Sequence, residues 1–188
     1  MLLLASSFVY INSDSVNNAI TSSVQTGNEN ENSLVGLVDQ EFWPVVRVSF
    51  PAKPFPNSLL ENLFEGTHSA EQYISEISGG DSQLKTTIVG ETWGSPYSES
   101  HWGTDSENER DTGADSGGAR ELARQAIMGT FQNQDISQWD LDGDFIVDRL
   151  LILHSGQAQE EGGPSTSIWS HFSAFYEPVT VGDYTFEH

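Results

Sequence analysis

An aspartate-rich turn that leads directly into an apolar segment constrains this chain more than any other feature. Residues 139–156 read WDLDGDFIVDRLLILHSG, with four aspartates on alternate or nearly alternate positions. Carboxylates this close repel one another unless a cation holds them together. Their spacing matches positions one, three, five and nine of a calcium loop, and a backbone carbonyl falls at position seven. The predicted calcium ligands are Asp140, Asp142, Asp144, the carbonyl of Ile146, and Asp148.

The turn departs from an EF-hand in two places. Position six, which favours glycine, is Phe145, and position twelve, which favours a bidentate glutamate, is Leu151. No helix is expected after the turn, because Arg149–Leu153 is short and leucine-rich and predicts a buried central strand. Glu160 and Glu161 follow a glycine turn and are candidate additional ligands of the same calcium ion. The alternative for all of these carboxylates is a solvated acidic surface.

The charge balance excludes one large class of function. The 188 residues carry 28 Asp and Glu against 7 Lys and Arg, a formal net charge of −21 with a pI near 4.2. Binding to a nucleic-acid backbone depends on clustered Lys and Arg, so no nucleic-acid partner is expected. There is no Cys, so any zinc ligands must come from carboxylates and the five His. The length suits one domain with a hydrophobic core.

The N-terminal part has the composition of a segment outside the folded domain. Residues 1–11 form a mostly apolar run, which suggests a signal-peptide remnant and is too short to span a bilayer, although no Lys or Arg precedes it. Residues 12–41 are rich in Asn, Ser and Glu, and indicate a disordered linker or pro-segment remnant. The domain is expected over residues 42–188. These patterns predict a secreted or extracellular protein with no stable membrane span.

The rest of the chain alternates between strand and helix patterns. A capping-box match, Ser69 with Gln72 three residues later, opens a helix that ends at a Gly-Gly pair. A second helix carries an apolar stripe from Leu122 to Phe131, with Asp115 or Ser116 as its cap. Runs of β-branched and apolar residues predict four strands, at residues 45–50, 84–93, 145–154 and 167–172. This order predicts an α+β fold with helices packed on a mixed sheet.

Several segments resemble the immune inhibitor A family of secreted zinc metallopeptidases, the sixth metallopeptidase family. The strongest match is WDLDGDFIVDRLLILHSGQAQEEGG at residues 139–163, followed by Ile-Trp-Ser-His at residues 168–171. Weaker matches are VVRVSFPAKPF at residues 45–55, AEQYISEISGG at residues 70–80 and VGDYT at residues 181–185. The family pattern usually has Gly where this chain has Phe145.

The resemblance implies a zincin-like fold, with a mixed twisted sheet, packed helices and an active-site helix bearing H-E-x-x-H. In that motif two histidines one helical turn apart bind zinc, and the glutamate activates the attacking water. No two of the five histidines here lie four residues apart, so the motif is expected outside this chain. What is expected is the N-terminal part of a metallopeptidase domain, truncated before its active-site helix and inactive alone, with protein or peptide substrates. The alternative is a calcium-binding structural or adhesion module without enzymatic activity, and the oligomeric state stays open.

Overall fold

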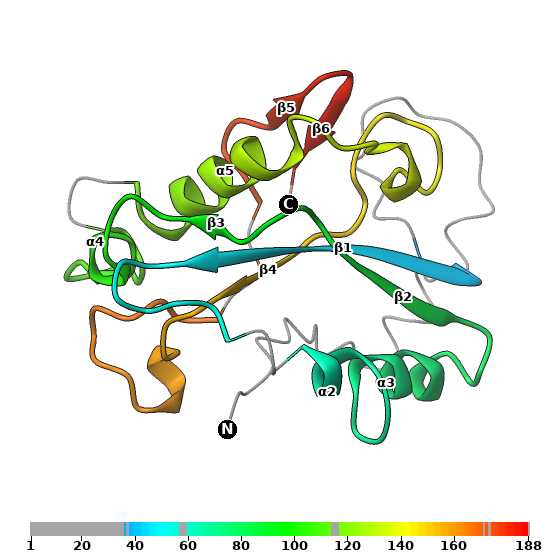
Figure 1. The fold of residues 1–188 in the computed structure, drawn as a ribbon, viewed down its shortest axis with the longest axis horizontal. Coiled ribbons are helices and arrows are strands. Elements are labelled where there is room, and N and C mark those ends of the chain that lie inside the picture. Colours follow the sequence, from blue (N-terminus) through cyan, green and yellow to red (C-terminus); the bar gives the residue numbers. More distant parts are fainter. Residues whose placement is uncertain are drawn as a thin grey trace.

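A four-stranded sheet built around one long strand forms the centre of the computed structural model (Figure 1). The structure describes residues 36, 38–56, 60–113, 117–170, 172 and 174–187. The strands of the sheet are β1 (Gln40–Ser49), β2 (Gln83–Ile88), β3 (Trp93–Gly94) and β4 (Leu151–His154). Val45 of β1 pairs with Ile88 and with Leu151, so β2 and β4 lie on opposite sides of β1. All of these strand pairs are parallel.

Helices cover both faces of this sheet. They are α2 (Glu61–Phe64), α3 (Ala70–Ile77), α4 (Glu99–Gly103) and α5 (Gly118–Phe131), with 3-10 turns η2 (Ser137–Trp139) and η3 (Gln159–Glu161). A separate antiparallel hairpin joins β5 (Val179–Val181) to β6 (Tyr184–Phe186). Figure 1 shows α5 and the hairpin on one side of the sheet, and α2 and α3 on the other. The combination of helices and strands confirms the predicted α+β class. The sheet was predicted to be mixed, but its described strand pairs are all parallel and the antiparallel pair lies in the separate hairpin.

β1 is central because its side chains are apolar on both faces. Val45, Val46 and Val48 are each 0% exposed, and β-branched residues favour the extended backbone. Successive side chains of a strand point to opposite faces. Val46 and Val48 accordingly join the larger core, which includes α5, whereas Val45 packs with α2 in a smaller one. β1 begins at Gln40, slightly before the expected domain start at residue 42.

Helix α3 begins and ends where its sequence predicts. The hydroxyl of Ser69 accepts a hydrogen bond from the amide of Gln72, and the Gln72 side chain accepts one from the amide of His68. A Gly-Gly pair with positive φ at residues 79–80 follows its last turn. On its predicted apolar face, Ile74 is buried. The predicted start of α3 at the Ser69 cap is therefore confirmed, although the Gln72 side chain bonds to the amide of His68 and not, as in a full capping box, to that of Ser69.

Helix α5 carries the apolar stripe that its sequence predicts. The buried side chains of this stripe are Leu122, Ala126, Ile127, Thr130 and Phe131. Gly129 lies against Trp93 of β3, where an added Cβ atom would come within 2.4 Å of the indole ring. The N-cap residue is Gly117, while the expected caps, Asp115 and Ser116, lie outside the described residues.

Two of the predicted strands are shorter than expected. The strand over residues 84–93 is interrupted between β2 and β3, where Gly90 adopts φ +56°. The strand over residues 145–154 forms only as β4. Phe145 bonds to the carboxylate of Asp140, and Ile146 and Val147 pair with Thr185 of β6 instead of with β1. Within the described residues β4 pairs with β1 alone, so the expectation of a central strand there was wrong.

The strand expected over residues 167–172 does not form in the described part of that segment. The amide of Trp169 donates to the carboxylate of Asp111 at 2.9 Å instead of to a neighbouring strand. Conversely, the β5–β6 hairpin was not predicted. Among the described strands, β5 and β6 form the antiparallel pair. No helix in the described part of the chain is long and apolar enough to cross a membrane.

Candidate metal site

The aspartate-rich turn is a loop between η2 and β4 that is fixed at both ends. Trp139, the last residue of η2, is 1% exposed and packs edge-on against Phe131 of α5. On the other side the loop bonds to β6, because Thr185 donates its amide to the carbonyl of Phe145 and Val147 donates to the carbonyl of Thr185. The packing of α5 and the hairpin therefore holds this loop in place.

The carboxylate of Asp140 organises the backbone of the loop. Its Oδ1 atom accepts the amides of Gly143 at 2.7 Å and Asp144 at 3.0 Å, and its Oδ2 atom accepts the amide of Phe145 at 3.0 Å. Asp side chains favour turns for this reason. Gly143 has φ +84° and Phe145 has φ +67°. The chain thus reverses through two left-handed residues, and at Phe145 that conformation is unfavourable.

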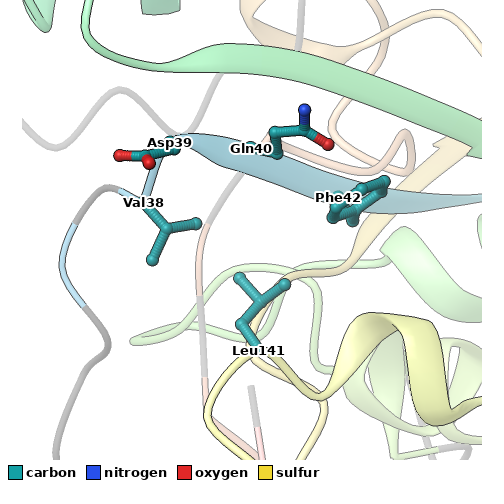
Figure 2. A pocket seen from close by; sticks show the side chains of 5 residues that line it. All are labelled: Val38, Asp39, Gln40, Phe42 and Leu141. Atoms are coloured by element: carbon teal, nitrogen blue, oxygen red, sulfur yellow. The ribbon is translucent and has the colours of Figure 1, made fainter.

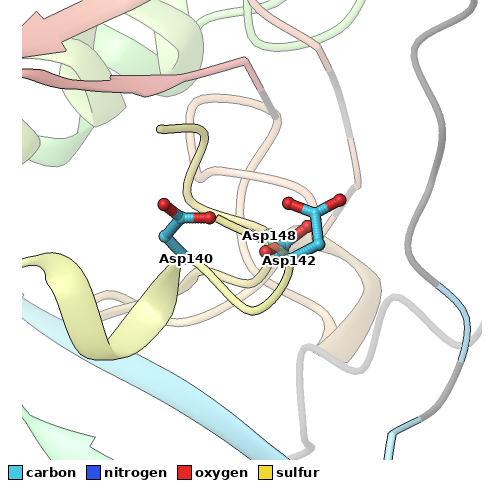
Figure 3. A group of neighbouring side chains, drawn as sticks. All are labelled: Asp140, Asp142 and Asp148. Atoms are coloured by element: carbon cyan, nitrogen blue, oxygen red, sulfur yellow. The ribbon is translucent and has the colours of Figure 1, made fainter. Parts of the chain in front are cut away.

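Three of the four predicted aspartates come together in this loop (Figure 3). One carboxylate oxygen from each of Asp140, Asp142 and Asp148 lies within 4.8 Å of the other two, and we call these three residues the aspartate triangle. Calcium binds carboxylate oxygens at about 2.3–2.6 Å, so two oxygens on one ion lie at most about 5 Å apart. The spacing of the triangle therefore fits a single calcium ion.

The other predicted ligands lie outside the aspartate triangle. The carboxylate of Asp144 is exposed, and its Oδ1 atom accepts the amide of Ile146 at 2.8 Å. Ile146 itself forms a bridge to β6. Glu160 accepts the amide of Ser170 with both carboxylate oxygens at 3.3 Å, and Glu161 is the last residue of η3. η3 follows the C-terminal end of β4, whereas the triangle precedes its N-terminal end.

Burial and mutual repulsion raise the pKa of two carboxylates of the triangle. Asp142 is exposed, but partial loss of solvent around its carboxylate is the main cause of its raised pKa, and the charges of Asp144 and Asp140 add to it. Burial also raises the pKa of Asp148, where the hydrogen bond from the amide of Leu141 opposes it and the charge of Asp142 reinforces it. A bound cation relieves such a concentration of negative charge. The arrangement is chemically suited to a hard divalent ion.

Comparison with known proteins decides the family. The family model described as immune inhibitor A peptidase M6, catalytic domain, matches residues 50–185, which is most of the chain. The chain belongs to the M6 peptidase family. No curated protein matches it. The matched span contains the aspartate triangle and both segments that most resemble this family, at residues 139–163 and 168–171.

Membership of the M6 family implies zinc, but the described residues of this M6 chain do not fit that metal. Among them, the aspartate triangle is the single group of three or more potential ligands close enough for one ion, and it contains no histidine. His154, at the end of β4, accepts the amide of Gly156 at its Nδ1 atom, and burial lowers its pKa. The Nδ1 atom of His154 is thus engaged by the protein backbone. His171 and His188 lie outside the described residues.

Sequence reasoning missed Arg149, which connects the loop of this M6 chain to β1. Arg149 donates from Nε to Oε2 of Glu41 at 2.8 Å and from Nη1 to the carbonyl of Asp148 at 3.1 Å. Glu41 is 0% exposed. The sequence signal for Arg149 is a lone arginine at the start of an apolar run. Its partner lies 108 residues away and gives no local signal.

Proposed function

We propose that this chain is the N-terminal part of the catalytic domain of a secreted zinc metallopeptidase that hydrolyses peptide bonds of proteins. The observation that carries the proposal is the match of the M6 catalytic-domain model to residues 50–185. Protein or peptide substrates follow from membership of a peptidase family. The acidic surface, with a net charge of −21, suits a protein that works in a salt-containing medium outside the cell.

In this enzyme the aspartate triangle would hold a structural calcium ion. Asp140, Asp142 and Asp148 offer hard oxygen ligands within 4.8 Å of one another. Asp144, whose charge already acts on Asp142, is the first candidate for a fourth ligand. The ion would neutralise the repulsion within the loop and so strengthen the connection between α5, β6 and β4. Its role is stabilisation of the fold rather than chemistry on the substrate.

The zinc ligands are proposed to lie outside these 188 residues, because the sequence contains no H-E-x-x-H. That motif supplies two zinc-binding histidines and the glutamate that activates water. The chain alone should therefore show no peptidase activity. Export is proposed from the apolar run at residues 1–11, which has the character of a signal-peptide core.

Calorimetric titration with calcium tests the metal site. The protein should bind calcium saturably and melt at a higher temperature in calcium than in chelator, because a ligand of the native state stabilises it by about 2.7 kcal/mol at a hundredfold excess over Kd. Asp142→Ala should lose both effects, whereas Asp81→Ala, at an exposed aspartate after α3, should keep them. Absence of binding at millimolar calcium would refute the calcium site and leave the family assignment intact.

A casein-hydrolysis assay, with and without a zinc chelator, tests the location of the zinc ligands. The 188-residue chain should release no peptides above the background of a heat-denatured sample. Chelator-sensitive hydrolysis by this chain would show that its own residues bind zinc. The parent gene offers a second test, since an H-E-x-x-H motif should follow in the same reading frame.

A further inference from the structure

A buried ion pair links the aspartate loop to the start of β1. Glu41, the second residue of β1, is 0% exposed, and the side chain of Arg149 is 17% exposed. Arg149 donates from Nε to Oε2 of Glu41 at 2.8 Å and from Nη2 to Oε1 at 3.4 Å. The indole of Trp43 also donates to Oε2 at 2.9 Å. The carboxylate of Glu41 therefore accepts hydrogen bonds at both oxygens, and a buried charge needs such partners.

The same pair holds the chain that leads into β1. The lead-in segment consists of residues 36, 38 and 39. The carbonyl of Gly36 accepts a hydrogen bond from Nη2 of Arg149 at 3.1 Å, and the amide of Val38 donates to Oε1 of Glu41 at 3.0 Å. The lead-in segment is thus attached to the domain through three backbone groups. Those of Gly36 and Val38 bond to the Glu41–Arg149 pair, and the carbonyl of Asp39 accepts the amide of Gln83 of β2 at 2.9 Å.

The aspartate triangle reaches this pair by two routes. Asp148 is a member of the triangle, and its carbonyl accepts Nη1 of Arg149 at 3.1 Å. Its carboxylate accepts the amide of Leu141 at 2.7 Å. The side chain of Leu141 points towards the start of β1 and lines an open pocket of about 590 Å³ together with Val38 and Phe42 (Figure 2). An ion that fixes Asp148 would therefore restrict both Arg149 and Leu141.

We propose that the Glu41–Arg149 pair couples the aspartate triangle to the lead-in segment, so that calcium at the triangle tightens the attachment of the chain where it enters β1. The inference rests on the proposed calcium site. Without calcium, the carboxylates of Asp142 and Asp148 repel each other, and the loop that carries Arg149 is less firmly held. Calcium would in this way protect the lead-in segment from opening.

Hydrogen exchange of the whole 188-residue chain, followed by mass spectrometry, tests the coupling. The amide of Val38 reports directly, since its acceptor is Glu41. A hundredfold excess of calcium over its Kd favours the closed state by up to about a hundredfold, so exchange in peptides that cover residues 36–43 should slow by about tenfold to a hundredfold. Arg149→Met should still bind calcium by calorimetry but lose this slowing. Arg124→Met, which removes an exposed arginine paired with Glu121, should keep it.

The outcomes separate the coupling from the calcium site. Calcium binding without slower exchange at residues 36–43 of the wild-type chain would overturn the coupling alone. A calcium response that persists in Arg149→Met would also overturn it. If calcium does not bind, both the proposed site and the coupling are wrong. The wild-type comparison needs no variant, so a failure of Arg149→Met to fold leaves the test intact.

Discussion

Phe145 offers a direct test of the backbone conformation of the metal loop. Its φ is +67°, and the left-handed conformation costs a residue with a side chain about 1–2 kcal/mol. Phe145→Ala and Phe145→Gly both remove the ring that packs on Tyr184, so the difference between them isolates the backbone. In a helix or strand, Ala is more favourable than Gly by about 0.5–1 kcal/mol. At residue 145 the order should invert, because the left-handed cost to Ala exceeds its usual advantage over Gly. Phe145→Gly should therefore be more stable than Phe145→Ala by about 0.5–1 kcal/mol.

Urea unfolding of the two variants in chelator measures this difference without a contribution from calcium. A matched pair of substitutions at Met128, an exposed residue of α5, gives the opposite order, because Ala is favoured over Gly in a helix by about 1 kcal/mol. Phe145→Gly should also bind calcium at least as tightly as the wild type, since glycine adopts the required turn freely. If Phe145→Ala proves as stable as Phe145→Gly while the Met128 pair behaves normally, the left-handed turn at residue 145 is refuted.

Further predictions concern packing, acid stability and the metal. Gly129→Ala should destabilise the fold by about 1–3 kcal/mol, because the new Cβ atom would meet the Trp93 ring at 2.4 Å; an unchanged urea midpoint would contradict this packing. Burial raises the pKa of Glu41, but hydrogen bonds, chiefly from Arg149, outweigh it and leave the pKa below its ordinary value. The stability that Glu41 contributes is thus present above the ordinary carboxyl pKa and lost as pH falls through the lowered one. The stability difference between wild type and Glu41→Gln should shrink on acidification, and urea titrations showing a constant difference would contradict it. Chelation should lower the melting temperature of the wild type and leave that of Asp142→Ala unchanged.

Local patterns predicted α3 and α5, because helix signals lie within a few residues of one another, whereas the short helices α2 and α4 were not predicted. The hydrogen bond from the amide of Gln72 to the hydroxyl of Ser69 confirms the start of α3, and the buried residues of α5 follow the predicted stripe from Leu122 to Phe131. The three aspartates of the triangle were also predicted, because alternate residues of a tight turn can face one point. Their partner ion remains a prediction.

Sequence-based prediction failed where side chains bond to backbone groups that a strand would use, or where two partners lie far apart in the sequence. Asp140 accepts three amides of the loop, and one of them is the amide of Phe145, which begins the strand predicted over residues 145–154. Glu160 was predicted as a further ligand beside the aspartates; its carboxylate accepts the amide of Ser170, and its part in the calcium site stays a prediction. The ion pair of Glu41 with Arg149 spans 108 residues, and no local pattern carries that information.

The position of β1 has a consequence for the order in which the domain can assemble. β1 is made first of the four strands, yet β4, its neighbour on one side, begins only at Leu151. During synthesis the valine-rich β1 is therefore complete long before β4, and more than half of the chain must still be made before both edges of β1 can pair. Long-range parallel pairing is slow, and an apolar strand with unpaired edges associates readily with other chains. Folding of this chain should accordingly complete only after synthesis has passed His154, and truncations before that residue should aggregate.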